Sequence, residues 1–146
     1  MCRTGERRET MCRIIFASHG DLSKGMKNSV NMLAGSVSDK VETYSLYPGE
    51  SPNDYYQKLL KEIPNSDEQV IILCDIKGGS VHTTLAQLTQ LNNVIVLSGM
   101  NLGMALDIVL RYQEGIPSED YEELLDSSRE GITLLTNLVS ETDEDF

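Results

Sequence analysis

Short apolar runs alternate with helix-like segments along most of this chain, and that alternation limits the fold more than any other feature. Three of the runs, RIIFAS (13–18), QVIILCD (69–75) and NVIVLSG (93–99), are almost continuously apolar, which is typical of strands covered on both faces. A fourth, KVETYSL (40–46), alternates between polar and apolar residues and indicates an edge strand. The sequence therefore predicts four short strands.

Each predicted strand is followed by a segment with the spacing of an amphipathic helix. The first helix is expected to end at Gly35, the second to begin at Ser51-Pro52, and the third to be capped by Ser80. The predicted helices cover about 22–34, 52–63, 81–91, 102–113 and 118–130. Their predicted core-facing side chains include Leu22, Met26, Val30 and Leu33 in the first and Leu106, Val109 and Leu110 in the fourth.

The resulting order, β-α-β-α-β-α-β-α-α, predicts an α/β protein with a single doubly wound, mainly parallel sheet and helices on both faces. Right-handed crossovers favour the strand order 2-1-3-4. The segment ITLLTNLV (132–139) has the length and composition of a further strand, and a helix is the alternative. With 146 residues the chain suits one domain, which we place at 11–140.

Composition excludes several classes of function. The net charge of −11 argues against nucleic acid and anionic membranes as partners, and no apolar run reaches the length of a membrane helix. Residues 1–10 lack the apolar stretch of a signal peptide, so we expect a cytoplasmic protein. MCR occurs at Met1 and again at Met11, and we interpret 1–10 as a disordered leader or an upstream-start artefact. Residues 141–146 form an acidic tail.

Unusual residues gather at the ends of the predicted strands. The first strand ends in Ser18-His19-Gly20, and the third ends in Asp75, shortly before Gly78-Gly79-Ser80. The carboxyl ends of parallel strands open on the same edge, where ligands bind in this architecture. Because the order 2-1-3-4 makes the first and third strands neighbours, we expect His19 and Asp75 to lie within reach of each other.

This combination has a chemical logic. A carboxylate that accepts a hydrogen bond from one imidazole nitrogen fixes the tautomer, so the other nitrogen keeps its lone pair and can act as a nucleophile. Gly78, Gly79 and Ser80 lead into a helix N-terminus, which favours an anion. Together with a binding role for Gly20, these features predict phosphoryl transfer to His19.

Each of these residues also has a plain structural interpretation. A histidine at a strand end can simply bond backbone, Asp75 can close an Asx turn, and Gly78-Gly79 can form an ordinary turn. Their placement on one predicted edge favours function. Lys77, His82, Ser98 and Asn101 are candidates for supporting roles there, although a half-exposed surface histidine is the simpler interpretation of His82. We expect no metal and no cofactor, since two histidines and Asp75 make a poor ligand set.

Three motifs give the chain a family resemblance: FASHGDLSKGM, CDIKGGSVHTTL and LSGMNLGMALDIVL. With SREGITLL near the end, they resemble the IIA component of the mannose/fructose/sorbose class of the bacterial sugar phosphotransferase system, over about 13–138. The resemblance implies that His19 accepts phosphate from the phosphocarrier HPr and passes it to a histidine of IIB, which phosphorylates sugar entering through the IIC and IID membrane subunits. It implies that Asp75 orients His19 and that Ser80 lies beside the phosphoryl group.

The resemblance further implies a homodimer, built in some members by exchange of a C-terminal strand, here 132–139. Val81, where some members have proline, and Lys77 and His82 depart from the typical pattern. These departures lie at the predicted edge and leave the phosphoryl chemistry intact.

Other functions fit less well. A response-regulator receiver would use Asp75 but needs an acidic pair after the first strand, where this chain has Ala17-Ser18-His19. A serine hydrolase lacks its Gly-x-Ser-x-Gly turn, and a flavin binder would find 5% aromatic residues and no Trp. A regulatory module, in which phosphorylation of His19 signals instead of supporting transport, stays open.

Overall fold

The sheet has the predicted topology. The structure is a computed structural model that describes residues 12–63 and 67–137. Its strands are β1 (Arg13–His19), β2 (Glu42–Leu46), β3 (Val70–Cys74) and β4 (Val94–Leu97). They form one sheet in the order β2-β1-β3-β4, and every neighbouring pair is parallel. The predicted order 2-1-3-4 is confirmed, and so is the position of the second strand at an edge.

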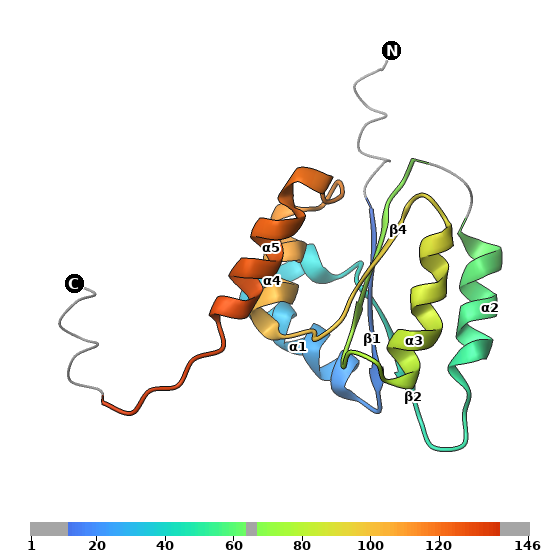
Figure 1. Cartoon of the computed structure of the whole chain (residues 1–146), viewed down its shortest axis with the longest axis horizontal. Helices are drawn as coiled ribbons and strands as arrows, with labels where there is room; N and C mark the ends of the chain where they lie inside the picture. The colour runs from blue at the N-terminus through green and yellow to red at the C-terminus, as the bar shows by residue number, and fades with distance from the viewer. Residues whose placement is uncertain (1–11, 64–66, 138–146) are drawn as a thin grey trace, which may run out of the picture.

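Helices cover both faces of this sheet (Figure 1). The α-helices are α1 (Leu22–Ala34), α2 (Pro52–Glu62), α3 (Ser80–Leu85), α4 (Leu102–Arg111) and α5 (Tyr121–Glu130). Short 3-10 helices η2 (Gly35–Ser38), η3 (Ala86–Gln90) and η4 (Ser118–Asp120) adjoin α1, α3 and α5. Helices α1, α4 and α5 lie on one side of the sheet, and α2 and α3 on the other. Within the described residues, no helix has the length and apolarity needed to cross a membrane.

The period-two alternation of the central strands builds a separate core on each face. Phe16 of β1 and Leu73 of β3 pack under α1, α4 and α5. Ala17 and Ile72 pack on the opposite face, under α2 and α3. All four are fully buried, so the two central strands are held from both sides and their carboxyl ends are fixed in position.

Several helix predictions need correction. Leu22, Leu33 and Leu110 are 51%, 63% and 56% exposed, whereas Val30 and Val109 are fully buried. In α1 the buried residues are Ser23 and Val30, whereas α4 buries Met104, Ala105, Ile108 and Val109, so the buried face of α4 is rotated from the predicted one.

Ser80 does not cap α3. It is the first residue of the helix, and Gly79 occupies the N-cap position in an extended conformation. The predicted helix also changes to 3-10 geometry at Ala86. The predicted cap Ser51 is confirmed, since its side chain accepts from the N–H of Asn53. Asn101, which was not predicted as a cap, accepts from the N–H of Met104 at the start of α4.

The predicted additional strand is not formed in the described part of the C-terminal segment. Residues 132–137 follow α5 without helix or strand structure. Ile132, Leu134 and Leu135 are 76%, 88% and 53% exposed, which is costly for three apolar side chains. The last residues of the predicted strand, 138 and 139, lie outside the described residues, as do the predicted leader (1–10) and acidic tail (141–146).

Candidate active site

His19 and Asp75 meet at the carboxyl edge of the sheet. His19 is the last residue of β1, and Asp75 directly follows β3. Asp75 Oδ2 lies 2.8 Å from His19 Nδ1 and accepts a second hydrogen bond, also 2.8 Å long, from the backbone N–H of His19. Asp75 Oδ1 accepts from the N–H of Ile76. The carboxylate is thus held at both oxygens, and its side chain is only 8% exposed, whereas that of His19 is 47% exposed.

These contacts determine which nitrogen of His19 carries the proton. An ionised carboxylate can only accept, so Nδ1 must carry the proton and Nε2 keeps its lone pair. Nε2 lies 3.3 Å from Ser80 Oγ. The imidazole therefore presents a nucleophilic nitrogen beside a hydroxyl that can donate to an incoming group.

The environment of Asp75 favours its ionised form. Burial by itself raises the pKa of this carboxyl, but the backbone and side-chain hydrogen bonds from His19 and the N–H of Ile76 outweigh it, so the pKa lies below its ordinary value. Asp75 is therefore charged at neutral pH. It can stabilise positive charge that develops on the imidazole.

The β3–α3 loop, residues 76–79, forms one wall of the site. It makes a turn closed by the N–H of Gly79 and the carbonyl of Ile76, at 3.2 Å, and Gly78 has a φ of +82°. A side chain at Gly79 would place its Cβ 2.8 Å from Ile76 Cγ2 and 3.3 Å from His19 Cε1. Gly79 is thus required for space, because the backbone lies directly against the imidazole, whereas Gly78 is required for its backbone conformation.

The β1–α1 turn uses hydroxyl groups that were not identified in the sequence. Ser18 Oγ accepts from the N–H of Ser23 at 2.7 Å and donates to the carbonyl of Gly20. Ser23 Oγ in turn donates to the carbonyl of Tyr44 on β2. Both serines are fully buried. A buried serine immediately before a candidate histidine, with a second serine in the first helical turn, was the available signal for this support.

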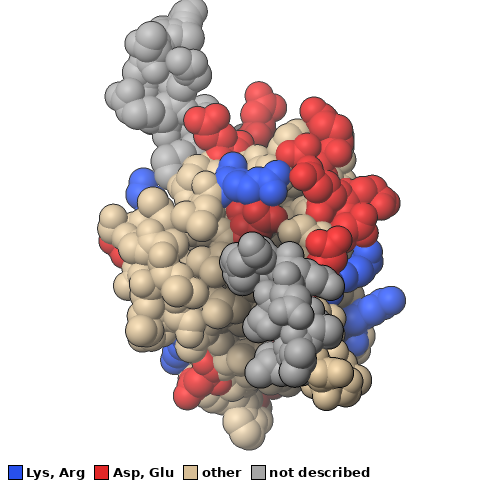
Figure 2. Space-filling view, turned by 90° about the vertical axis from the view of Figure 1, so that its left-hand side faces the viewer, with Lys and Arg blue, Asp and Glu red and all other residues tan. Residues whose placement is uncertain are grey.

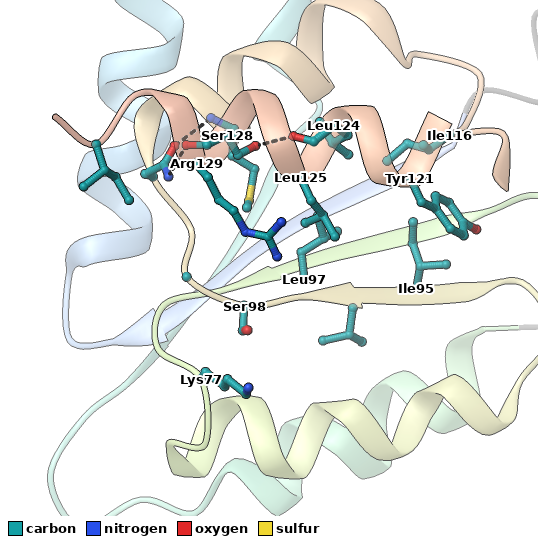
Figure 3. A pocket seen from close by; sticks show the side chains of 15 residues that line it. Lys77, Ile95, Leu97, Ser98, Ile116, Tyr121, Leu124, Leu125, Ser128 and Arg129 are labelled. Atoms are coloured by element: carbon teal, nitrogen blue, oxygen red, sulfur yellow. Dashed lines mark hydrogen bonds between the residues drawn. The ribbon is translucent and has the colours of Figure 1, made fainter. Parts of the chain in front are cut away.

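The predicted supporting residues fall into two places. His82 contacts the loop beside His19, where its Nδ1 accepts a 3.0 Å hydrogen bond from the N–H of Gly78. Lys77, Ser98 and Asn101 instead line a pocket of about 550 Å³ between β4 and α5, shown in Figure 3. His19 does not line this pocket.

The pocket between β4 and α5 is largely apolar. Its walls come from β4, α4 and α5, and Lys77 and Arg129 approach it from opposite sides (Figure 3). Ile132, at the start of the C-terminal segment, also borders it. The apolar lining suits hydrophobic side chains.

Charged groups elsewhere are mostly acidic. Figure 2, which views the molecule from the α5 side, shows acidic side chains gathered over part of this face. Glu119, Glu122, Glu123 and Asp126 are among the exposed acids of η4 and α5. Among residues 12–63 and 67–137, no group of three or more His, Cys, Asp or Glu side chains is arranged to hold a metal ion.

Known proteins share both the sequence pattern and the fold. The family model for the fructose IIA component of the phosphotransferase system (PTS) matches residues 13–125. The sorbose-specific EIIA component of the PTS from Klebsiella pneumoniae is 35% identical over 101 residues, which cover 68% of this chain and 73% of that protein.

Solved structures agree with this match. The PTS component EIIA from Streptococcus agalactiae is 28% identical with a TM-score of 0.73, covering 85% of this chain and 97% of that one. A PTS IIA protein associated with the fucose utilization operon from Streptococcus pneumoniae is 26% identical with a TM-score of 0.70, covering 90% and 96%.

Proposed function

The chain belongs to the IIA components of the mannose/sorbose class of the sugar phosphotransferase system, and on that premise we propose that His19 is its phosphoryl acceptor. The proposed donor is the phosphohistidine of HPr, and the proposed acceptor is a histidine of the IIB subunit, which serves the IIC and IID membrane subunits. The observation that supports this most directly is the contact between His19 Nδ1 and Asp75 Oδ2, because it leaves Nε2 with a lone pair on an exposed ring.

The proposed step exchanges one phosphorus–nitrogen bond for another. The lone pair of His19 Nε2 attacks the phosphorus of phospho-HPr, while the bond to the HPr imidazole breaks and its electron pair returns to that imidazole. The His19 ring becomes positively charged at the moment of transfer, and the carboxylate of Asp75 stabilises this charge through Nδ1–H. Transfer to IIB is the same exchange in the opposite sense.

Ser80 and the β3–α3 loop are placed to receive the phosphoryl oxygens. Ser80 Oγ lies 3.3 Å from Nε2, so its hydroxyl can donate to an oxygen of a group bound there. Gly79 leaves the space beside the ring unfilled, and Gly20, with a φ of +57°, turns the chain away immediately behind His19. These features support a phosphoryl-binding role for the predicted residues.

We further propose that the protein is a homodimer in which residues 132–139 of each chain pair with β4 of the other. Strand β4 lies at the edge of the sheet, so its outer backbone groups can accept another strand. Beside it lies the apolar pocket, and Leu134 and Leu135 are exposed apolar side chains of a segment, 132–137, that has no strand structure in the single chain. Pairing would bury both.

The function is tested with phosphoenolpyruvate, enzyme I and HPr. We expect this protein to acquire phosphate that is labile in acid and stable in alkali, and fragmentation should place it on the peptide that contains His19. The variant His19→Gln should acquire none, because its amide has no nucleophilic lone pair. Phosphate retained in that variant would contradict the proposal, and an acylphosphate on Asp75, cleaved by alkali and by hydroxylamine, would instead indicate receiver-like chemistry. A thermal melt shows whether the variant keeps its fold.

A further inference from the structure

The second histidine of the chain lies one helical turn from the phosphoryl-acceptor edge and contacts the loop that forms its wall. His82 is in the first turn of α3, between the fully buried Val81 and the exposed Thr83. Its Nδ1 lies 3.0 Å from the backbone nitrogen of Gly78, which donates to it. Because Nδ1 accepts, the proton of this imidazole is on Nε2, the opposite arrangement to that in His19.

We propose that His82 is a positioning residue, which holds the β3–α3 loop so that Gly79 and Ser80 are correctly placed against His19. This inference rests on the proposed function of His19, and it concerns how that site is shaped. His82 does not touch the phosphoryl group in this scheme. It acts only through the N–H of Gly78.

The geometry of the turn explains why one hydrogen bond matters. The turn runs from Ile76 to Gly79, and its third residue, Gly78, has a φ of +82°, as at the third position of type II turns. In the type I alternative the φ of that residue is about −90°, and the peptide between Lys77 and Gly78 is turned over by roughly half a rotation. The N–H of Gly78 belongs to this peptide. A bond from that N–H to His82 therefore selects one of the two turns.

Few other contacts hold the loop. The carbonyl of Gly78 accepts from Thr83 Oγ1 at 3.3 Å, and the carbonyl of Gly79 accepts from the N–H of Thr83 at 2.8 Å. Ile76, Lys77 and Gly78 are exposed, so packing contributes little to their position. The start of α3 is firmly placed, because Val81 and Leu85 are fully buried in the core. His82 thus connects an exposed glycine turn to a helix that is fixed by its buried side chains.

The position of this loop determines the space beside the reacting nitrogen. An ideal Cβ on Gly79 would lie 3.3 Å from His19 Cε1, so the backbone is already in close approach to the ring. Ser80, the next residue, places its hydroxyl 3.3 Å from Nε2. Turning over the peptide before Gly78 would redirect the backbone that leads into Gly79 and Ser80, and a misplacement of about 1 Å can slow a transfer step by roughly 10²-fold.

Three substitutions separate the hydrogen-bond acceptor from the rest of the imidazole. In His82→Asn, the side-chain oxygen occupies the position of Nδ1 and can accept from Gly78 N–H. In His82→Gln, the polar group lies farther out, near the position of Nε2. His82→Phe keeps a planar ring and removes the acceptor altogether. All three changes are made in the full-length chain.

The readout is the rate of phosphoryl transfer from phospho-HPr at saturating concentration, followed by rapid quench. We expect His82→Phe and His82→Gln to be roughly 2- to 10-fold slower than the unmodified protein, as expected for loss of one hydrogen bond whose donor can turn to water. His82→Asn should restore most of the rate. Equal rates for the Phe variant and the unmodified protein would overturn the inference, and so would equal rates for the Asn and Gln variants.

A second measurement does not depend on phosphoryl transfer. The amide proton of Gly78 should exchange faster with solvent in His82→Gln than in His82→Asn, measured by nuclear magnetic resonance. Imidazole nitrogen shifts should show the proton of His82 on Nε2. If His19 is never phosphorylated, the proposed function fails while this amide comparison still tests the contact. If phosphorylation proceeds normally and the amide rates do not differ, the positioning role fails alone. If His82→Phe does not fold, the transfer rates of the Asn and Gln variants alone decide the question.

Discussion

The β1–β3 edge and the surface beside β4 differ in whether one chain supplies all the contacts that each region needs. At the β1–β3 edge, the carboxylate, the imidazole and the adjoining loops are joined by hydrogen bonds within one chain. Beside β4, an apolar pocket adjoins an edge strand, and the nearby C-terminal segment exposes its leucines. The first region contains what its proposed chemistry needs, whereas the second has apolar surface that a further chain can cover. We therefore assign the phosphoryl chemistry to the β1–β3 edge and subunit assembly to the region beside β4.

Substitution of Asp75 tests the first region and should have the largest effect. In Asp75→Asn, an amide oxygen at the position of Oδ2 can still accept from both the backbone N–H and Nδ1–H of His19, but the group is uncharged and its NH2 then faces the N–H of Ile76. The positive charge that develops on the imidazole during transfer would lose the carboxylate that stabilises it. We expect the rate of phosphoryl transfer to fall by about 10²- to 10⁴-fold, the range seen when an acid–base partner is lost.

The control for this variant is Asp126→Asn, which removes an exposed carboxylate of α5 that pairs with Arg129. It should leave the transfer rate unchanged. If Asp75→Asn transfers phosphate as fast as this control, Asp75 serves only to close the turn at the end of β3. The β1–β3 edge would then differ from the region beside β4 without Asp75 having a role in phosphoryl transfer.

The fold was readable from the sequence because its signals are local and repeated. Near-continuous apolar runs identified the inner strands, and a Ser-Pro pair identified the start of α2. The strand order followed from chirality rules, which hold for parallel sheets in general. The solvent exposure of Leu33 and Leu110 could not be read in the same way, because it depends on how each helix is rotated against the sheet.

The site was readable only in part. The approach of His19 to Asp75 followed from the strand order, since both residues end neighbouring strands. Lys77 was grouped with them because it is close in sequence, yet it lines the other pocket. Which way a side chain leaves a glycine turn depends on φ at Gly78, and glycine permits either sign. The contact between His82 and Gly78 depends on the same angle and could not be predicted.

Substitution of Leu134 tests the second region and should have an intermediate effect. Leu134 is 88% exposed in the single chain, and the proposed strand pairing would bury it against β4 or α5. In Leu134→Asp, a charge would replace that side chain, so the dimer dissociation constant should rise by about 10- to 100-fold, from the free energy of burying one leucine. Sedimentation velocity over a range of concentrations measures this change.

The matched control is Met32→Asp, because Met32 is an equally exposed apolar residue (81%) on α1. It should leave the dissociation constant unchanged. A protein that is monomeric before any substitution would rule out the proposed assembly. An effect of Met32→Asp equal to that of Leu134→Asp would place the interface elsewhere. Phosphorylation of His19 in the Leu134 variant would show that the first region works without the second.

The pH dependence of stability gives the smallest expected effect, and it isolates the electrostatic part of the first region. The pKa of Asp75 is lower in the folded protein than its ordinary value, because hydrogen bonds from His19 and Ile76 outweigh the effect of burial. A carboxyl with a lowered folded pKa stabilises the fold above its unfolded pKa, and this contribution is lost as the pH falls through the folded pKa. We expect Asp75→Asn to be less stable than the unmodified protein by on the order of 1 kcal/mol at pH 7. Urea unfolding at pH 7 and pH 3 should show this difference shrinking in acid.

The exposed pair of Asp126 should contribute little at either pH, and Asp126→Asn provides that baseline. A difference for Asp75→Asn that is the same at both pH values would mean that packing, and not the charge of the carboxylate, holds the end of β3 against β1.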